Sequence, residues 1–314
     1  MPPLVDHLQF NEPPVEFSTE IGPTSPALAR FLWNGLASNT RKMYGSHQRS
    51  YEYFCATHSQ TPFPATCHTL GEWITGRGIG SATPYQGILL PDSCQNALSA
   101  IRSIHVDRGF STEVFKSEWL ARIMKGIRRV QPHHEKTQAA PLTIDILEKL
   151  VGHPSPTPLL PIQKMTASSI NDLNVTVASK VAYAGFLRGG EMFYDSKDLA
   201  NRSVFSNTKL SRSDITFGIN DEHVVLTLKQ SKTDTLHKGV DIILAATGTA
   251  TCLVLALCQL WIQDPQPWGA PLFRLANRAF SSDAVMTIIR ARLRTHSIQN
   301  YASFTSYSFR RGAA

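Results

Sequence analysis

Thr305-Ser-Tyr-Ser-Phe-Arg-Arg-Gly-Ala-Ala314 is best read together with two segments upstream of it. These are Phe186-Leu-Arg-Gly-Gly-Glu191 and Leu228-Lys-Gln-Ser-Lys-Thr-Asp234. The segment at 305–314 places Arg310, and the segment at 186–191 places Arg188, at the end of an apolar helical stretch. The segment at 228–234 places a lysine on a hairpin. A guanidinium fork binds two phosphate oxygens at once and keeps its charge near neutral pH. The three segments therefore predict a site that grips one phosphate.

The order and spacing of these residues resemble the tyrosine recombinase/integrase family, in particular the eukaryotic branch found in fungal Crypton-like mobile elements. The family pattern is an arginine in a Leu-Arg-x-x-Glu setting, a hairpin lysine, a His-x-x-Arg box, a further His or Trp, and a tyrosine nucleophile. By this resemblance Arg188 is the first catalytic arginine and Glu191 the carboxylate that orients it. Lys232 is the hairpin lysine, which in the family protonates the departing 5′ oxygen of the broken DNA strand. Arg310 is the second catalytic arginine, and Tyr307 stands in the histidine slot.

The resemblance covers residues 27–314 and implies a fold that is mainly α with a small antiparallel β-sheet. It implies two domains, a helical SAM-like core-binding domain and a tyrosine-recombinase catalytic domain, which close around double-stranded DNA. The resemblance is compatible with a homo-oligomer on DNA. It implies no cofactor, no metal ion and no association with a membrane. The last two elements of the family pattern do not occur before Ala314, so we expect the chain as given to be incomplete or inactive as an enzyme. The resemblance implies a nuclear protein if the source is eukaryotic and a cytoplasmic one otherwise, and not a secreted one.

The leading interpretation is a DNA-binding protein of the tyrosine recombinase class that acts in DNA recombination or integration of a mobile element. In the family, a tyrosine forms a covalent bond to the DNA phosphate while the arginines neutralise the charge that develops on it. The alternative is a non-catalytic DNA-binding module derived from a recombinase. A third class, a scaffold that binds other proteins, has only the proline-rich residues 1–26 in its favour. Whether the chain is an enzyme stays open.

Each candidate residue also has a plainer interpretation. Arg188 could be a surface arginine favoured by the helix dipole, but the two glycines after it would let a DNA backbone approach. Lys229 is the alternative to Lys232, and either could be a solvated loop lysine. Tyr307 can donate a hydrogen bond to a phosphate oxygen, but a phenol with a pKa of about 10 does not replace imidazole as a proton acceptor. Tyr301 is no better supported as a nucleophile.

Periodicity and turn residues predict the organisation of the chain. We expect a flexible leader over 1–26, a helical core-binding (DNA-binding) domain over 27–131, a linker over 132–141 and the catalytic domain over 142–314. Helices are predicted at 38–55, from 70 onward, and at 92–105, 117–130, 143–150, 167–189, 250–263 and 282–298. An irregular connector is predicted at 76–93, and three antiparallel strands at 215–217, 224–228 and 240–244.

Basic residues of the N-terminal part are candidates for contacts to DNA phosphates, which position DNA without reading its bases. They are Arg41, Lys42, Arg122, Lys125, Arg128 and Arg129. The last four share one helical segment, and the simpler alternative is a solvated basic face. The net charge of +7 suits a polyanionic partner.

The composition argues against several other classes. The five cysteines are odd in number and contain no C-x-x-C pair, which disfavours a disulfide framework or a zinc site. The N-terminus lacks the basic start and apolar core of a secretory signal. The most apolar stretch, Val240 to Ile262, is broken by Asp241 and Gly248 and predicts a strand, a turn and a buried helix instead of a membrane span. The motifs H-E-x-x-H, G-x-S-x-G and G-x-G-x-x-G are absent.

Overall fold

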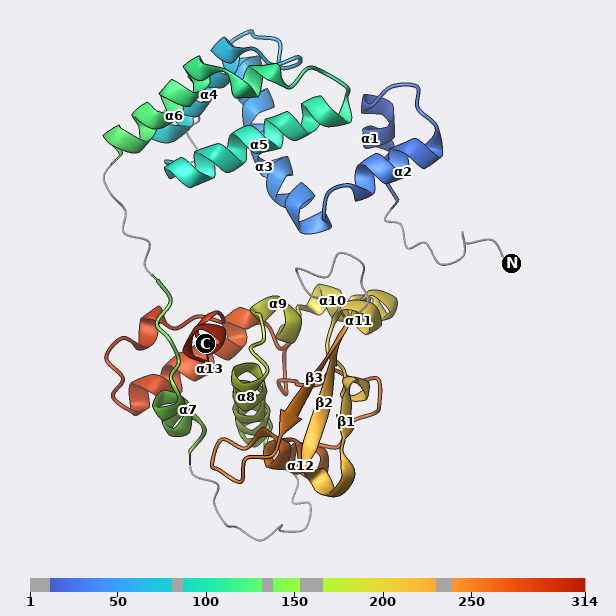
Figure 1. The fold of residues 1–314 in the computed structure, drawn as a ribbon, viewed down its shortest axis with the longest axis vertical. Coiled ribbons are helices and arrows are strands. Elements are labelled where there is room, and N and C mark those ends of the chain that lie inside the picture. Colours follow the sequence, from blue (N-terminus) through green and yellow to red (C-terminus); the bar gives the residue numbers. More distant parts are fainter. Residues whose placement is uncertain (1–11, 81–86, 132–137, 153–165, 230–238, 314) are drawn as a thin grey trace. The chain divides into compact units, whose positions relative to one another are not determined.

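The structure, a computed structural model, describes residues 12–80, 87–131, 138–152, 166–229 and 239–313 (Figure 1). The chain divides into two compact units, Met1–Glu135 and Lys136–Ala314. Each unit has its own cluster of buried apolar side chains, and each is described by itself.

The described part of the N-terminal unit is mainly helical. Its helices are α1 (Val15–Glu20), α2 (Pro26–Asn34), α3 (Ser38–Thr57), α4 (Cys67–Ile79), α5 (Pro91–Asp107) and α6 (Glu118–Val130). Helix α3 packs on α4 and α5, and α6 packs on the same two helices. Tyr51, Trp73 and Ile101 have no exposed surface in the core between them. Apolar residues at helical spacing thus produce a bundle, as predicted.

The N-terminal unit differs from expectation in two places. The segment expected to be a flexible leader contains α1, because Phe17 is buried and packs edge-on against Trp33, with ring centroids 4.9 Å apart. The expected connector begins later than residue 76, because α4 continues to Ile79 and ends at Gly80 with a φ of 82°. Glycine is tolerated inside α4 because α6 packs closely there: a Cβ on Gly78 would lie 3.2 Å from the Ile127 side chain.

The C-terminal unit combines helices with a small sheet. Its helices are α7 (Ile144–Val151), α8 (Ala167–Ala184), α9 (Gly189–Met192), α10 (Ser196–Ala200), α11 (Arg202–Thr208), α12 (Leu253–Gln263), α13 (Ser282–Thr295) and α14 (Ser308–Ala313). Its strands are β1 (Ile215–Phe217), β2 (His223–Leu228) and β3 (Val240–Ala245). They form an antiparallel sheet in the order β1–β2–β3. The predicted strands and the predicted fold class, mainly α with a small antiparallel sheet, are confirmed.

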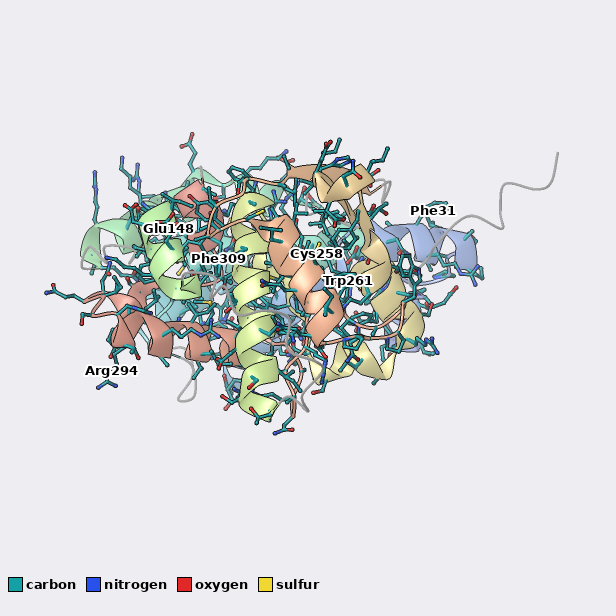
Figure 2. All side chains as sticks on the ribbon, turned by 90° about the horizontal axis from the view of Figure 1, so that it is seen from below. Phe31, Glu148, Cys258, Trp261, Arg294 and Phe309 are labelled. Carbon is teal, nitrogen blue, oxygen red and sulfur yellow. The ribbon has the colours of Figure 1, made fainter. Side chains whose placement is uncertain are left out.

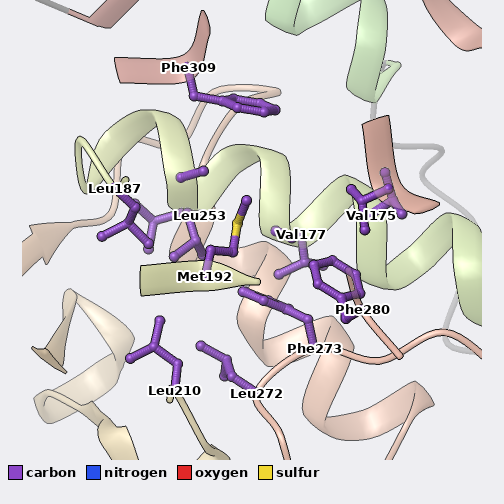
Figure 3. Close-up of a cluster of buried hydrophobic side chains, with 14 of the residues drawn as sticks. Val175, Val177, Leu187, Met192, Leu210, Leu253, Leu272, Phe273, Phe280 and Phe309 are labelled. Atoms are coloured by element: carbon purple, nitrogen blue, oxygen red, sulfur yellow. The ribbon is translucent and has the colours of Figure 1, made fainter. Parts of the chain in front are cut away.

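Helix α8 is the centre of this unit. Helices α7, α12, α13 and α14 pack against it, and β3 lies against α12 (Figure 1). The period-two alternation of β2 turns Val224 and Leu226 into the core. Leu187 and Phe309 belong to the same core cluster (Figure 3). Since these two residues directly precede Arg188 and Arg310, both candidate arginines are anchored to one core.

Candidate functional site

The first arginine segment begins with an unusual helix end. Helix α8 ends at Ala184, earlier than the predicted residue 189. The amides of Leu187 and Phe186 donate back to the last turn of α8, at 3.0 and 3.2 Å, in the pattern of a Schellman motif. Phe186 takes the left-handed position of this motif with a φ of 51°, a position that glycine usually fills. The turn directs Leu187 into the core and leaves Arg188 half-buried just beyond the helix.

Glu191 orients Arg188. Nη1 of Arg188 donates to Oε1 of Glu191 at 3.0 Å, and the backbone amide of Arg188 donates to Oε2 at 2.7 Å. Arg188 is the N-cap residue of α9, so this carboxylate also closes the first turn of that helix. Only 9% of Glu191 is exposed, and a buried carboxylate requires such partners. One side chain therefore fixes both the backbone and the guanidinium of Arg188.

The second arginine segment lies directly against the first. Nη1 of Arg310, in α14, donates to the carbonyl oxygen of Phe186 at 3.3 Å. At a second point, a Cβ on Gly189 would lie 2.8 Å from Oγ of Ser306, so a side chain at this position would collide. The two segments thus meet on both sides of Arg188 although they are far apart in the sequence.

Further contacts fasten α14 to the start of the C-terminal unit. The amide of Leu142 donates to the carbonyl of Ser308 at 3.0 Å. A Cβ on Gly312 would lie 1.9 Å from the carbonyl oxygen of Leu142, which shows how closely the two backbones approach. Arg311 donates to the carbonyl of Ala139 at 2.8 Å. The helix that carries Arg310 is therefore held by backbone contacts and by its neighbouring arginine.

A cavity of about 370 Å³ opens beside the glycines that follow Arg188. Its lining residues are Gly189, Gly190, Phe193, Tyr194, Asp195, Asp198, Lys209, Ser282, Ser306 and Tyr307. Tyr307 is 58% exposed. Nζ of Lys209 donates to the carbonyl of Phe193 at 3.0 Å and lies 3.4 Å from the Asp198 carboxylate. Sequence reasoning missed Lys209 and Ser306, because no local pattern marks residues that only the fold brings to this cavity.

Of the two candidate hairpin lysines, the structure describes only Lys229. Nζ of Lys229 lies 2.7 Å from the carboxylate of Asp214 and also donates to the Lys209 carbonyl at 3.1 Å and to Oγ of Ser211 at 3.2 Å. Lys229 is therefore held in internal contacts. Lys232, the better match to the family pattern, lies outside the described residues.

A buried ion network that the sequence did not reveal supports the C-terminal unit. The carboxylate of Asp264, 3% exposed, accepts from Nε of Arg274 at 3.1 and 3.0 Å and from Asn174 at 3.0 Å. Burial alone would raise the pKa of Asp264, but the hydrogen bonds from Arg274 and Asn174 outweigh it and the pKa is lowered. Arg212 lies 3.7 Å from the same carboxylate, and its guanidinium stacks on the ring of Trp261. Trp261, in α12, is labelled in Figure 2. Burial lowers the pKa of Arg212 to about 10.

In the N-terminal unit, helix α6 presents exposed basic side chains opposite its buried apolar side. These residues, called here the basic surface of α6, are Arg122, Lys125, Arg128 and Arg129. Lys42, near the start of α3, is exposed as well.

Arg41 has an internal role instead. Its Nε donates to the carbonyl of Trp33 at 2.8 Å and its Nη2 to that of Leu32 at 2.7 Å, while Nη1 lies 3.4 Å from Asp107. The guanidinium also stacks on the Trp33 ring, 4.1 Å from its centroid. Only 13% of the Arg41 side chain is exposed. Arg41 thus ties α2 to α3 and α5, and these contacts occupy the guanidinium that the sequence marked as a candidate for DNA binding.

Comparisons with known proteins do not assign this chain to a family. No protein-family model and no curated protein matches the chain. Among solved structures, the chain is similar to one titled "Crystal structure of XerA recombinase", with 14% identity over 94% of this chain and 81% of that chain and a TM-score of 0.32. A likeness at this TM-score carries no argument about function. Within the described residues there is no cluster of three or more metal-binding side chains, and none of the described helices is long and apolar enough to cross a membrane.

Proposed function

We propose that this protein binds DNA through a phosphate site of the tyrosine recombinase kind and takes part in DNA recombination or integration of a mobile element. One observation carries the proposal: Arg310 donates to the carbonyl of Phe186, two residues before Arg188. The fold thus gathers two arginine segments that are distant in sequence at one place. A pair of guanidinium forks suits the several oxygens of a single phosphate.

The proposed chemistry follows from these groups. The two arginines stabilise the negative charge that develops on the phosphate oxygens during strand transfer. Because Glu191 already holds Arg188, little reorganisation is needed when this charge appears. In this proposal Lys232 is the acid that protonates the leaving oxygen, and Tyr307 donates a hydrogen bond to the phosphate. The basic surface of α6 contacts neighbouring phosphates without reading bases.

A second candidate function, a non-catalytic DNA-binding module, is favoured by Tyr307 in the histidine position. A phenol donates a hydrogen bond to phosphate but does not accept a proton as imidazole does near neutral pH. A suicide DNA substrate, which traps covalent protein–DNA adducts, separates the two functions. We expect no adduct through Tyr307. An adduct that forms with the wild-type chain and disappears in Tyr307→Phe would make Tyr307 the nucleophile and exclude the non-catalytic module.

A double-mutant cycle tests whether the two arginines share one phosphate. We expect Arg188→Met and Arg310→Met each to weaken duplex binding by ~1.5–3 kcal/mol, the usual contribution of a hydrogen bond to a charged group. If both bind one phosphate, their effects differ from additivity by about 0.5 kcal/mol or more. Arg294→Met is the matched control, because Arg294 is exposed on the outside of α13 (Figure 2) and its replacement removes the same charge. The control cycle, Arg188→Met with Arg294→Met, should show no coupling energy. An equally small coupling energy between Arg188→Met and Arg310→Met would exclude a shared phosphate.

A further inference from the structure

Four described helices, α3, α5, α8 and α13, end in the same turn. In each, an amide just past the helix donates back to the last turn, at 2.8, 2.8, 3.0 and 3.0 Å respectively. The residue before that amide takes a left-handed conformation, with φ of 52° at Ser59, 70° at Gly109, 51° at Phe186 and 58° at Ser297. Three of these helices place a small residue in the left-handed position. Only α8, among these four, places a large aromatic residue there.

Burial compensates only part of the backbone strain at Phe186. A left-handed backbone costs an L-residue about 1–2 kcal/mol, and a bulky residue in it is a genuine outlier. Phe186 is 45% exposed, so the hydrophobic effect recovers only part of this cost. The ring also makes no aromatic or cation–π contact within the described residues. Backbone strain of this kind persists mainly at functional sites.

The position of Phe186 indicates what that function is. Its carbonyl accepts the hydrogen bond from Arg310, and Arg188 follows two residues later. Phe186, a residue with an exposed ring, therefore lies at the contact between the two arginine segments that are proposed to hold a DNA phosphate. The group nearest to a backbone phosphate that offers a flat apolar face is a nucleobase, and bases stack on aromatic side chains whatever their sequence.

We propose that the ring of Phe186 stacks on an unpaired nucleobase next to the phosphate bound by Arg188 and Arg310, an inference that rests on the proposed function. The base must be unpaired, because a paired base inside a duplex does not expose its face. Phe186 then gives the site a preference for DNA that is locally opened beside the bound phosphate. Glycine, serine or any other small residue in the same turn would remove this preference.

The substitution Phe186→Gly separates a stacking role from a structural one, because the two properties change in opposite directions. Glycine relieves the strained backbone, so the melting temperature of the full chain should rise by about 2–4 °C. Affinity for a short duplex with a central unpaired stretch should fall roughly 5- to 150-fold, the factor that corresponds to one stacked base. Affinity for the fully paired duplex should stay unchanged. Phe186→Tyr keeps the stacking ring and should keep the affinity for both DNAs.

Ser297→Gly is the matched control. It relieves the same left-handed turn in the same unit at the end of α13, so it should raise the melting temperature without changing either affinity. Phe186→Gly could leave the affinity for opened DNA unchanged while Arg188→Met lowers DNA binding. That result would reject base stacking by Phe186 and retain the proposed phosphate site. If neither substitution changes binding, or the wild-type chain binds no DNA, both proposals are wrong.

Discussion

Gly312→Ala tests the close approach that holds the Arg310 helix in place. Two effects of this substitution have opposite signs. Gly312 lies inside α14, and replacing a helical glycine with alanine normally stabilises a protein by up to ~1 kcal/mol. Against this, the new Cβ would lie 1.9 Å from the carbonyl oxygen, 2.3 Å from the carbonyl carbon and 2.7 Å from the nitrogen of Leu142. All three neighbours are backbone atoms, so no side chain can rotate away.

The collision should dominate. Overpacking of this kind costs typically ~1–3 kcal/mol. The shift needed to relieve it also endangers the 3.0 Å hydrogen bond from Leu142 to Ser308, worth about 0.5–1.5 kcal/mol. After subtraction of the helix-propensity gain, the free energy of unfolding should fall by roughly 1–3 kcal/mol. In Gly126→Ala, on α6, the Cβ meets no atom within 4 Å, so only the gain of up to ~1 kcal/mol remains.

Urea denaturation and calorimetry of the full chain would measure both variants. We expect Gly312→Ala to lower the transition of the C-terminal unit and Gly126→Ala to raise that of the N-terminal unit. The two substitutions should therefore change stability in opposite directions. A Gly312→Ala variant as stable as Gly126→Ala would show that α14 does not lie against the Leu142 backbone.

The remaining predictions concern charge. Asp264→Asn should lower the unfolding free energy at pH 7 by ~3–5 kcal/mol, because it leaves the buried Arg212 without its carboxylate. The folded-state pKa of Asp264 is lowered from 3.8, so its contribution is present above pH 3.8 and is lost as the pH falls through the folded pKa. Urea titrations at pH 7 and pH 3 should therefore show a smaller difference at pH 3, and a constant difference would contradict this. Arg41→Met should destabilise the N-terminal unit but leave the salt dependence of duplex binding unchanged, whereas a reduced slope would restore Arg41 as a DNA-binding residue. Alanine at all positions of the basic surface of α6 should flatten the plot of log affinity against log salt by about 0.9 for each DNA phosphate that these side chains neutralise, and an unchanged slope would place the DNA elsewhere.

Much of the fold could be predicted because hydrophobic periodicity carries it. The alternation of apolar residues marked all three strands, and helical spacing marked the long helices. The end of α8 was misplaced for a physical reason. Glycine usually fills the left-handed position after a helix, but Phe186 takes that position after α8 at a cost in strain, so residue type does not mark this helix end. The short helices α10 and α11 were missed because five to seven residues are too few to show a period.

The candidate site was only partly visible in the sequence. The pair Arg188–Glu191 lies within one turn and could be proposed from local spacing together with the family resemblance. The hydrogen bond from Arg310 to the Phe186 carbonyl depends on the packing of α14 against α8, which no local pattern encodes. Arg41 illustrates the converse problem. A basic residue near a helix start suggests DNA binding, but the Trp33 ring and two backbone carbonyls of α2 contact its guanidinium. Charge alone does not tell a binding residue from a packed one.

The two arginines share a construction that links the stability of the unit to the site. Each follows a buried apolar residue, Leu187 at 1% and Phe309 at 0% exposure, and burial of such a side chain contributes about 1.5–3 kcal/mol. This energy fixes the backbone from which each guanidinium extends, and Glu191 then fixes the direction of Arg188. Long side chains held in this way lose less freedom when they bind, because their order is established on folding. The proposed phosphate site would thus be preorganised by the core beneath it, so a cavity made by Phe309→Ala should weaken DNA binding without removing any charge.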